Sequence, residues 1–121
     1  MSKLAQVYAN VVGVKLPAKP PAFPVNYYPA PEKYITLQAG ASDKARVYDY
    51  YNLVIMLIAP ILKQHNIDII NIGGKDDPAI FGTIDYRGKT SIHQASYLIE
   101  NALLHFGSDS CWSHMAGIKK V

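Results

Sequence analysis

A chain of 121 residues forms one domain at most, and with half of its residues hydrophobic and 17% charged we expect a folded core rather than disorder. The net charge of +3 comes from basic residues scattered along most of the chain, which argues against a nucleic-acid partner. A single cysteine, no signal peptide and no apolar run of about 20 residues together predict a cytoplasmic protein without a transmembrane segment.

Residues 1–33 are predicted to form a helix followed by a linker. Apolar side chains recur at helical spacing from Leu4 to Val12, and Ser2 can cap this helix. The stretch "KLPAKPPAFPVNYYPAPEKY" then contains six of the eight prolines. Because proline lacks a backbone donor and favours extended structure, we expect a connector there, ahead of a domain over residues 34–121.

Short apolar strands alternate with helices in that domain. Strands are predicted at "YITLQAG", "IDIINIGG", "TIDYRG" and "LLHFGS". A long helix over residues 50–66 has Asp49 as its expected cap and Pro60 as an expected kink, and Ser91 opens the next helix. This alternation predicts an α/β fold, a Rossmann-like parallel sheet with helices on both faces.

Three loops rich in glycine and polar side chains follow predicted strands: "QAGASDKAR", "IGGKDDPA" and "FGSDSCWSH". Ligands bind to such sheets at the carboxyl ends of the strands, so we expect the loops to converge on one site. The prediction depends on all three together, since neither a G-x-x-x-x-G-K-[ST] nor a G-x-G-x-x-G motif is present.

The third loop has the composition of a phosphate site. Asp109 or Ser110 can cap a helix whose first free N–H groups belong to residues 111–113. Free N–H groups at a helix start bind phosphate, and His114 can add a donor. The alternative is an ordinary capped helix with Trp112 packed against a neighbour.

The other two loops offer cations and carboxylates. Lys44 and Arg46 can hold a diphosphate, and the alternative is solvated surface charge. After the second strand, Asp76 or Asp77 can accept hydrogen bonds from ribose hydroxyls, and the alternative is a turn or a cap.

No metal and no other cofactor is implied, because the four histidines show no paired ligand spacing and a single cysteine adds no zinc set. His65 and His93 are expected at the surface, and His105 in the core with its hydrogen bonds satisfied. A Cys111–His114 nucleophile pair is a minor alternative, because a helix start favours the thiolate.

The stretch "GKTSI" at residues 88–92 is followed by an apolar helix, a strand, and then Asp109, Ser110, His114 and Ala116. This order resembles the carboxyl-terminal half of the ADP-heptose:lipopolysaccharide heptosyltransferase-like glycosyltransferases, which carry G-K-[TM]-S-[LI] and D-[ST]-G-x-x-H-x-A motifs. These are GT-B enzymes, with two Rossmann-like halves around a cleft. The resemblance covers residues 34–118, and the segment before them looks like the family's interdomain helix and linker.

The resemblance implies that the chain binds a nucleotide diphospho-sugar. It implies that the phosphates contact the loop at residues 38–46 and the helix start after residue 109. It also implies that Asp76 or Asp77 contacts the ribose and that Thr90 lines the base pocket. The implied donor-binding residues are Ser42, Lys44, Arg46, Asp76, Asp77, Thr90, Asp109, Ser110, Cys111, Trp112, Ser113 and His114.

The chain departs from the family pattern in three ways. Cys111 replaces the motif's glycine and Trp112 a small residue, which narrows the phosphate turn, and Arg46 replaces a lysine. The family's catalytic base lies in the other half, so no catalytic residue is assigned here. The chain also ends where the family's next strand begins, so we expect a truncated domain.

The sequence therefore predicts the donor-binding part of an inverting glycosyltransferase that acts on a glycan or lipid-linked acceptor. A partner domain or a second copy is expected to cover the sheet edge. The alternatives are a non-catalytic nucleotide-binding or assembly subunit, and a relative of the GT-B nucleotide-sugar epimerases.

Overall fold

The computed structural model describes residues 3–13, 15, 24–40, 48–108 and 114–117. Within them, parallel strands form one sheet in the order β3-β2-β1-β4. The strands are β1 (Tyr34–Gln38), β2 (Asp68–Asn71), β3 (Ile84–Asp85) and β4 (His105–Gly107), and the helices are α1 (Lys3–Val12), α2 (Tyr51–Gln64) and α3 (Ile92–Glu100). A helical turn at residues 114–117 follows β4. The predicted α/β class and parallel sheet are confirmed.

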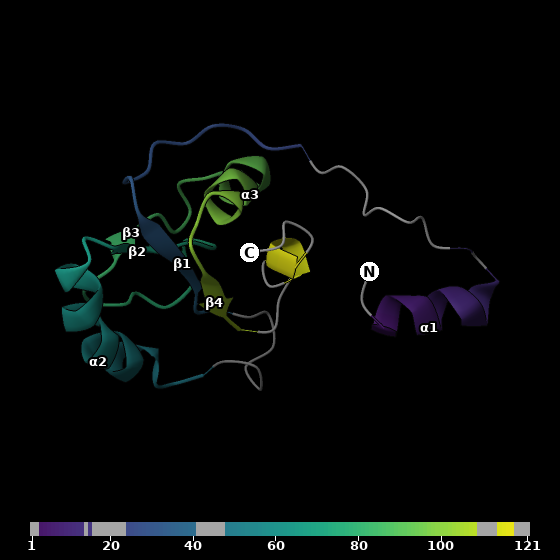
Figure 1. Ribbon diagram of the computed structural model, residues 1–121, viewed down its shortest axis with the longest axis horizontal. Helices are drawn as coiled ribbons and strands as arrows, with labels where there is room; N and C mark the ends of the chain where they lie inside the picture. The colour runs from purple at the N-terminus through teal and green to yellow at the C-terminus, as the bar shows by residue number, and fades with distance from the viewer. Residues whose placement is uncertain (1–2, 14, 16–23, 41–47, 109–113, 118–121) are drawn as a thin grey trace.

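Helices α2 and α3 cover opposite faces of the sheet, as predicted (Figure 1). Side chains along a strand alternate between its faces, so the fully buried β1 contributes to two cores. Leu37 packs under α2 with Ile55, whereas Tyr34 packs under α3 with Leu98. The Tyr34 hydroxyl also donates to the Leu98 carbonyl at 2.7 Å, and burial raises the pKa of Tyr34 to about 12.

Helix α2 begins at Tyr51, one residue later than the sequence predicts. Its N-cap is Tyr50, and no side chain caps it. The expectation that Asp49 caps this helix is therefore wrong, because Asp49 lies outside the first turn. The helix continues through Pro60 and ends at Gln64, and its C-cap His65 is exposed, as expected. No described helix, α2 included, is long and apolar enough to cross a membrane.

Helix α3 begins as predicted, with Ser91 as its N-cap. The Ser91 hydroxyl accepts from the Gln94 N–H at 3.1 Å, and the Gln94 side chain accepts from the Ser91 N–H at 2.8 Å. This reciprocal capping box satisfies two backbone donors at the start of the helix. It fixes the point at which the chain turns from β3 back across the sheet towards β4.

Replacing Ser91 by alanine removes one of these two hydrogen bonds, so Ser91→Ala is expected to lower the free energy of unfolding by about 1 kcal/mol. Ser91→Thr keeps the hydroxyl and should lose less. Urea denaturation of both variants measures the difference. Equal losses in the two variants, or no loss with alanine, would contradict this role of the hydroxyl.

Residues 24–33 of the proline-rich connector form neither helix nor strand, and this part of the connector packs on α3. The Asn26 N–H donates to the His93 carbonyl at 3.1 Å, and a ring nitrogen of His93 lies 2.9 Å from the Pro24 carbonyl. Tyr27 meets Tyr97 edge-on, with ring centroids 5.3 Å apart. His93 is therefore half-buried rather than at the surface. Helix α1, by contrast, lies away from the sheet (Figure 1).

Candidate functional site

The carboxyl ends of β1 and β4 lie side by side at one edge of the sheet. The Ser108 N–H donates to the Gln38 carbonyl at 2.9 Å, and the Ser108 hydroxyl donates to the Ala39 carbonyl at 3.1 Å. Two of the predicted site segments, residues 41–47 and 109–113, therefore begin at adjacent positions. The candidate residues in these two segments lie outside the described residues: Ser42, Lys44, Arg46, Asp109, Ser110, Cys111, Trp112 and Ser113.

The second predicted loop, which follows β2, lies at the same edge, and there Asp77 folds back towards the strand ends. Its carboxylate accepts from the Gly74 N–H at 3.0 Å and from the Gln38 side-chain amide at 3.3 Å. The same amide donates to the Gly40 carbonyl. Asp77 thus joins the ends of β1 and β2. Of the two interpretations that the sequence left open for Asp77, a ribose ligand or a turn residue, these contacts correspond to the turn residue.

Glycines make room for that carboxylate. A Cβ atom added at Gly40 or at Gly73 would overlap with the side chain of Asp77, and Gly73 also has a positive φ of 128° that favours glycine. The backbone at Gly73 thus lies close to the Asp77 carboxylate of the same chain.

An ion pair supports this turn from the β3 side, and the sequence did not single it out. Arg87 binds both carboxylate oxygens of Asp85, at 2.8 and 2.9 Å, and donates to the Asp77 carbonyl at 2.6 Å. The paired guanidinium lowers the pKa of Asp85 to about 2. The signal that could have revealed it is the spacing "DYR" at the end of a short strand. Arg87 thus links β3 to the loop that carries Asp76 and Asp77.

The remaining described candidates lie around this edge. Asp76 is exposed in the turn after β2, and Thr90 is half-buried immediately before the cap of α3. The loop before Thr90 contacts the β2 loop, because the Gly88 N–H donates to the Gly73 carbonyl at 2.7 Å. His114 is exposed at the start of the helical turn after β4. The structure thus brings the bases of all three predicted loops to one edge.

One buried polar pair lies inside the sheet, between β1 and β4. The Thr36 hydroxyl lies 2.8 Å from Nδ1 of His105, while Nε2 of His105 is buried and has no partner among the described residues. We expected both ring nitrogens of this core histidine to have hydrogen-bond partners, but among the described residues only Nδ1 has one. Burial lowers the pKa of His105 to about 4, so the ring is neutral at pH 7.

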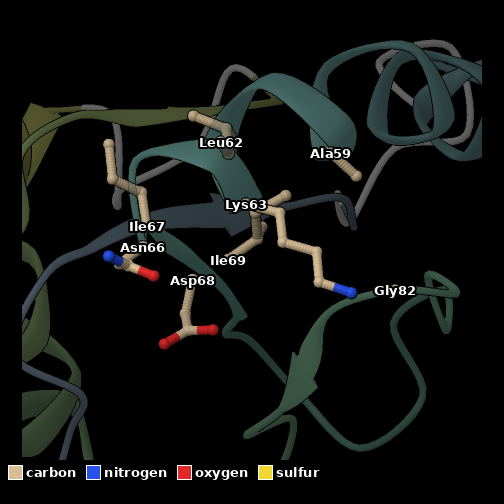
Figure 2. A pocket seen from close by; sticks show the side chains of 8 residues that line it. All are labelled: Ala59, Leu62, Lys63, Asn66, Ile67, Asp68, Ile69 and Gly82. Carbon is tan, nitrogen blue, oxygen red and sulfur yellow. The ribbon is translucent and has the colours of Figure 1, made fainter.

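A cavity of about 310 Å³ lies at the opposite edge of the sheet, where α2 ends and β2 begins (Figure 2). Lys63 and Asp68 both line it, with their charged ends directed apart. Because ligands of parallel α/β sheets bind at the carboxyl ends of the strands, this cavity is not the predicted site. In the described part of the chain, no group of three or more His, Cys, Asp or Glu side chains is placed to hold a metal ion.

No protein-family model matches the sequence, and no curated protein matches it. Solved structures do match the fold. The iron-containing dodecameric glycosyltransferase TibC from enterotoxigenic E. coli H10407 superimposes with a TM-score of 0.69 and 18% identity, over 90% of this chain and 32% of TibC. Its dodecameric complex with ADP-D-beta-D-heptose gives 0.68 and 17% identity, over 92% and 31%.

The E. coli ADP-heptose lps heptosyltransferase II matches with a TM-score of 0.60 and 16% identity, over 98% of this chain and 36% of that enzyme. The chain therefore has the fold of a part of the heptosyltransferases and spans about a third of the length of the structures it matches. The resemblance inferred from the sequence motifs is confirmed at the level of fold.

Proposed function

We propose that this chain forms the donor-binding part of an inverting glycosyltransferase of the heptosyltransferase type, and that its ligand is a nucleotide diphospho-sugar. The observation that supports this proposal is the adjacency of Ala39 and Ser108, which are hydrogen-bonded at the carboxyl edge of the sheet. These residues immediately precede the loop with Lys44 and Arg46 and the segment with the D-S-x-x-x-H motif. The loop with the two cations and the segment with the proposed phosphate motif therefore follow strand ends that lie next to each other.

The proposed chemistry is stabilisation of a leaving group. When a sugar is transferred, the diphosphate of the nucleotide gains negative charge, which nearby cations and N–H groups offset without a change in their own positions. We assign this role to Arg46, Lys44 and the segment at residues 110–114. Asp76 contacts the ribose in this proposal, because the Asp77 carboxylate is engaged within the chain. Thr90 lines the base pocket.

We assign donor binding, but no catalytic residue, to this chain. In this proposal residues 34–121 form the nucleotide-sugar domain, residues 1–33 supply a helix and a linker, and a glycan or lipid-linked hydroxyl accepts the sugar. The protein acts in the cytoplasm. Among the described strands β4 is an outermost strand of the sheet, and in this proposal a partner domain or a second copy covers its outer side.

Calorimetric titration with ADP and with a panel of nucleotide diphospho-sugars tests the proposal. Arg46→Ala removes a charged hydrogen-bond donor, so it should weaken binding by about 1.5–3 kcal/mol, or roughly 10- to 150-fold in Kd. Lys44→Ala should also weaken binding.

The matched control is Lys33→Ala. Lys33 is exposed and precedes β1, so it lies at the opposite edge of the sheet and its loss should leave binding unchanged. No binding of any diphosphate by the folded chain would refute the proposal, as would equal affinities of the Arg46→Ala and Lys33→Ala variants.

A further inference from the structure

Helix α2 is apolar on two faces. One face packs on the sheet through Tyr51 and Ile55. The other face carries a second set of apolar side chains at helical spacing, each half exposed or more. We name this set the α2 stripe: Leu53, Met56, Leu57 and Ile61. The outer face of a surface helix is normally polar, so an apolar stripe there indicates a protein partner.

Apolar grooves flank the stripe on both sides. On the β3 side, a groove of about 520 Å³ is bordered by Phe81, which is 93% exposed. On the β4 side, a groove of about 370 Å³ is bordered by Leu104 and Phe106. A helical ridge between two grooves can interdigitate with the ridge of another helix.

We propose that the α2 stripe is the contact surface between two copies of this chain, which pack α2 against α2 in antiparallel orientation around Met56 and Leu57. This inference is independent of the proposed function, because no residue of the stripe is among the proposed donor-binding residues. A two-fold contact uses the same patch on both copies, and the uncharged stripe can meet its own copy without repulsion.

The charges at the two ends of α2 determine the orientation. Exposed Asp49 precedes the helix, exposed Lys63 lies in its last turn, and Met56 is midway between them in the sequence. An antiparallel pair centred on Met56 places Asp49 of each copy beside Lys63 of the other. A parallel pair would place like charges together, which is unfavourable.

The available area is sufficient for a specific dimer. The stripe and Phe81 together expose roughly 600 Å², so two copies would bury about 1,200 Å², the lower limit of stable interfaces. In the antiparallel pair Phe81, which lies beside the first half of α2, would contact the second half of the other copy's helix.

Sedimentation velocity of the full chain over a micromolar concentration series tests the dimer. Leu57→Glu places a charge at the centre of the contact on a side chain that is 67% exposed, so the fold should survive while dimer dissociation rises at least about tenfold. Two matched controls, Leu103→Glu and Val11→Glu, change exposed apolar residues outside the stripe and should leave the dimer intact.

Charge exchange tests the orientation. Asp49→Lys alone should weaken the dimer, and Asp49→Lys combined with Lys63→Asp should restore it. Far-UV circular dichroism checks that each variant is folded. A chain that stays monomeric throughout the series would overturn the proposal, as would a dimer that survives Leu57→Glu or one that Val11→Glu dissociates.

Discussion

Gly107→Ala is expected to lower the free energy of unfolding by about 3 kcal/mol or more, because no side chain fits between β4 and β1 at this position. A Cβ atom at Gly107 would overlap with the Gln38 carbonyl oxygen and lie 3.0 Å from the Gln38 carbonyl carbon and nitrogen. These are backbone atoms of the neighbouring strand, so no rotamer change relieves the contact. The strands must separate, which breaks the Ser108-to-Gln38 hydrogen bond.

Urea denaturation followed by circular dichroism measures this loss. Gly117→Ala is the matched control, because an added Cβ there meets no atom within 4 Å and the residue belongs to a helical turn. Gly40→Ala is an informative intermediate, since the atoms nearest to its Cβ would be those of the Asp77 carboxylate, a side chain that can move, rather than backbone. Similar stabilities for the Gly107 and Gly117 variants would show that β4 does not pair this closely with β1.

Stability is expected to fall by about 2 kcal/mol between pH 7 and pH 4, because His105 resists protonation in the folded chain. Its pKa is about 4 when folded, against 6.5 for an unperturbed histidine. Between these values the unfolded chain binds the proton more readily, so the stabilisation is complete above pH 6.5 and is lost as the pH falls. The full difference corresponds to about 3 kcal/mol, which partial exposure of the ring reduces.

The cause lies in the environment of the ring. A protonated imidazole has two donors, but Nε2 is buried without a partner among the described residues. Urea midpoints at several pH values measure the dependence, and His105→Gln, which cannot be protonated, should flatten the curve above pH 4. An unchanged slope in that variant would assign the pH dependence to other groups.

Much of the fold was predictable because its signals are local. The sequence predicted that Ser91 opens a helix, and the structure confirms Ser91 as the N-cap of α3. The structure adds that Gln94, three residues along, completes a capping box. Alternation of apolar strands with helices predicted a parallel sheet covered on both faces, because only that arrangement buries such strands. The predicted cap of α2, Asp49, lies one residue before the observed N-cap, Tyr50. The local sequence did not specify at which of these two residues the first turn starts.

The sequence by itself determined which loops follow the strands and hence at which edge of the sheet we propose a site. Only the tertiary structure decided which contacts the described side chains there make. Asp77 binds Gln38, which is distant in the sequence, and this contact assigns the carboxylate to a turn rather than to a free binding position. A Cβ atom at position 107 would overlap with Gln38 because β4 pairs with β1, and burial in the same part of the sheet lowers the pKa of His105. Such long-range contacts depend on strand order, which local propensities and spacing do not specify.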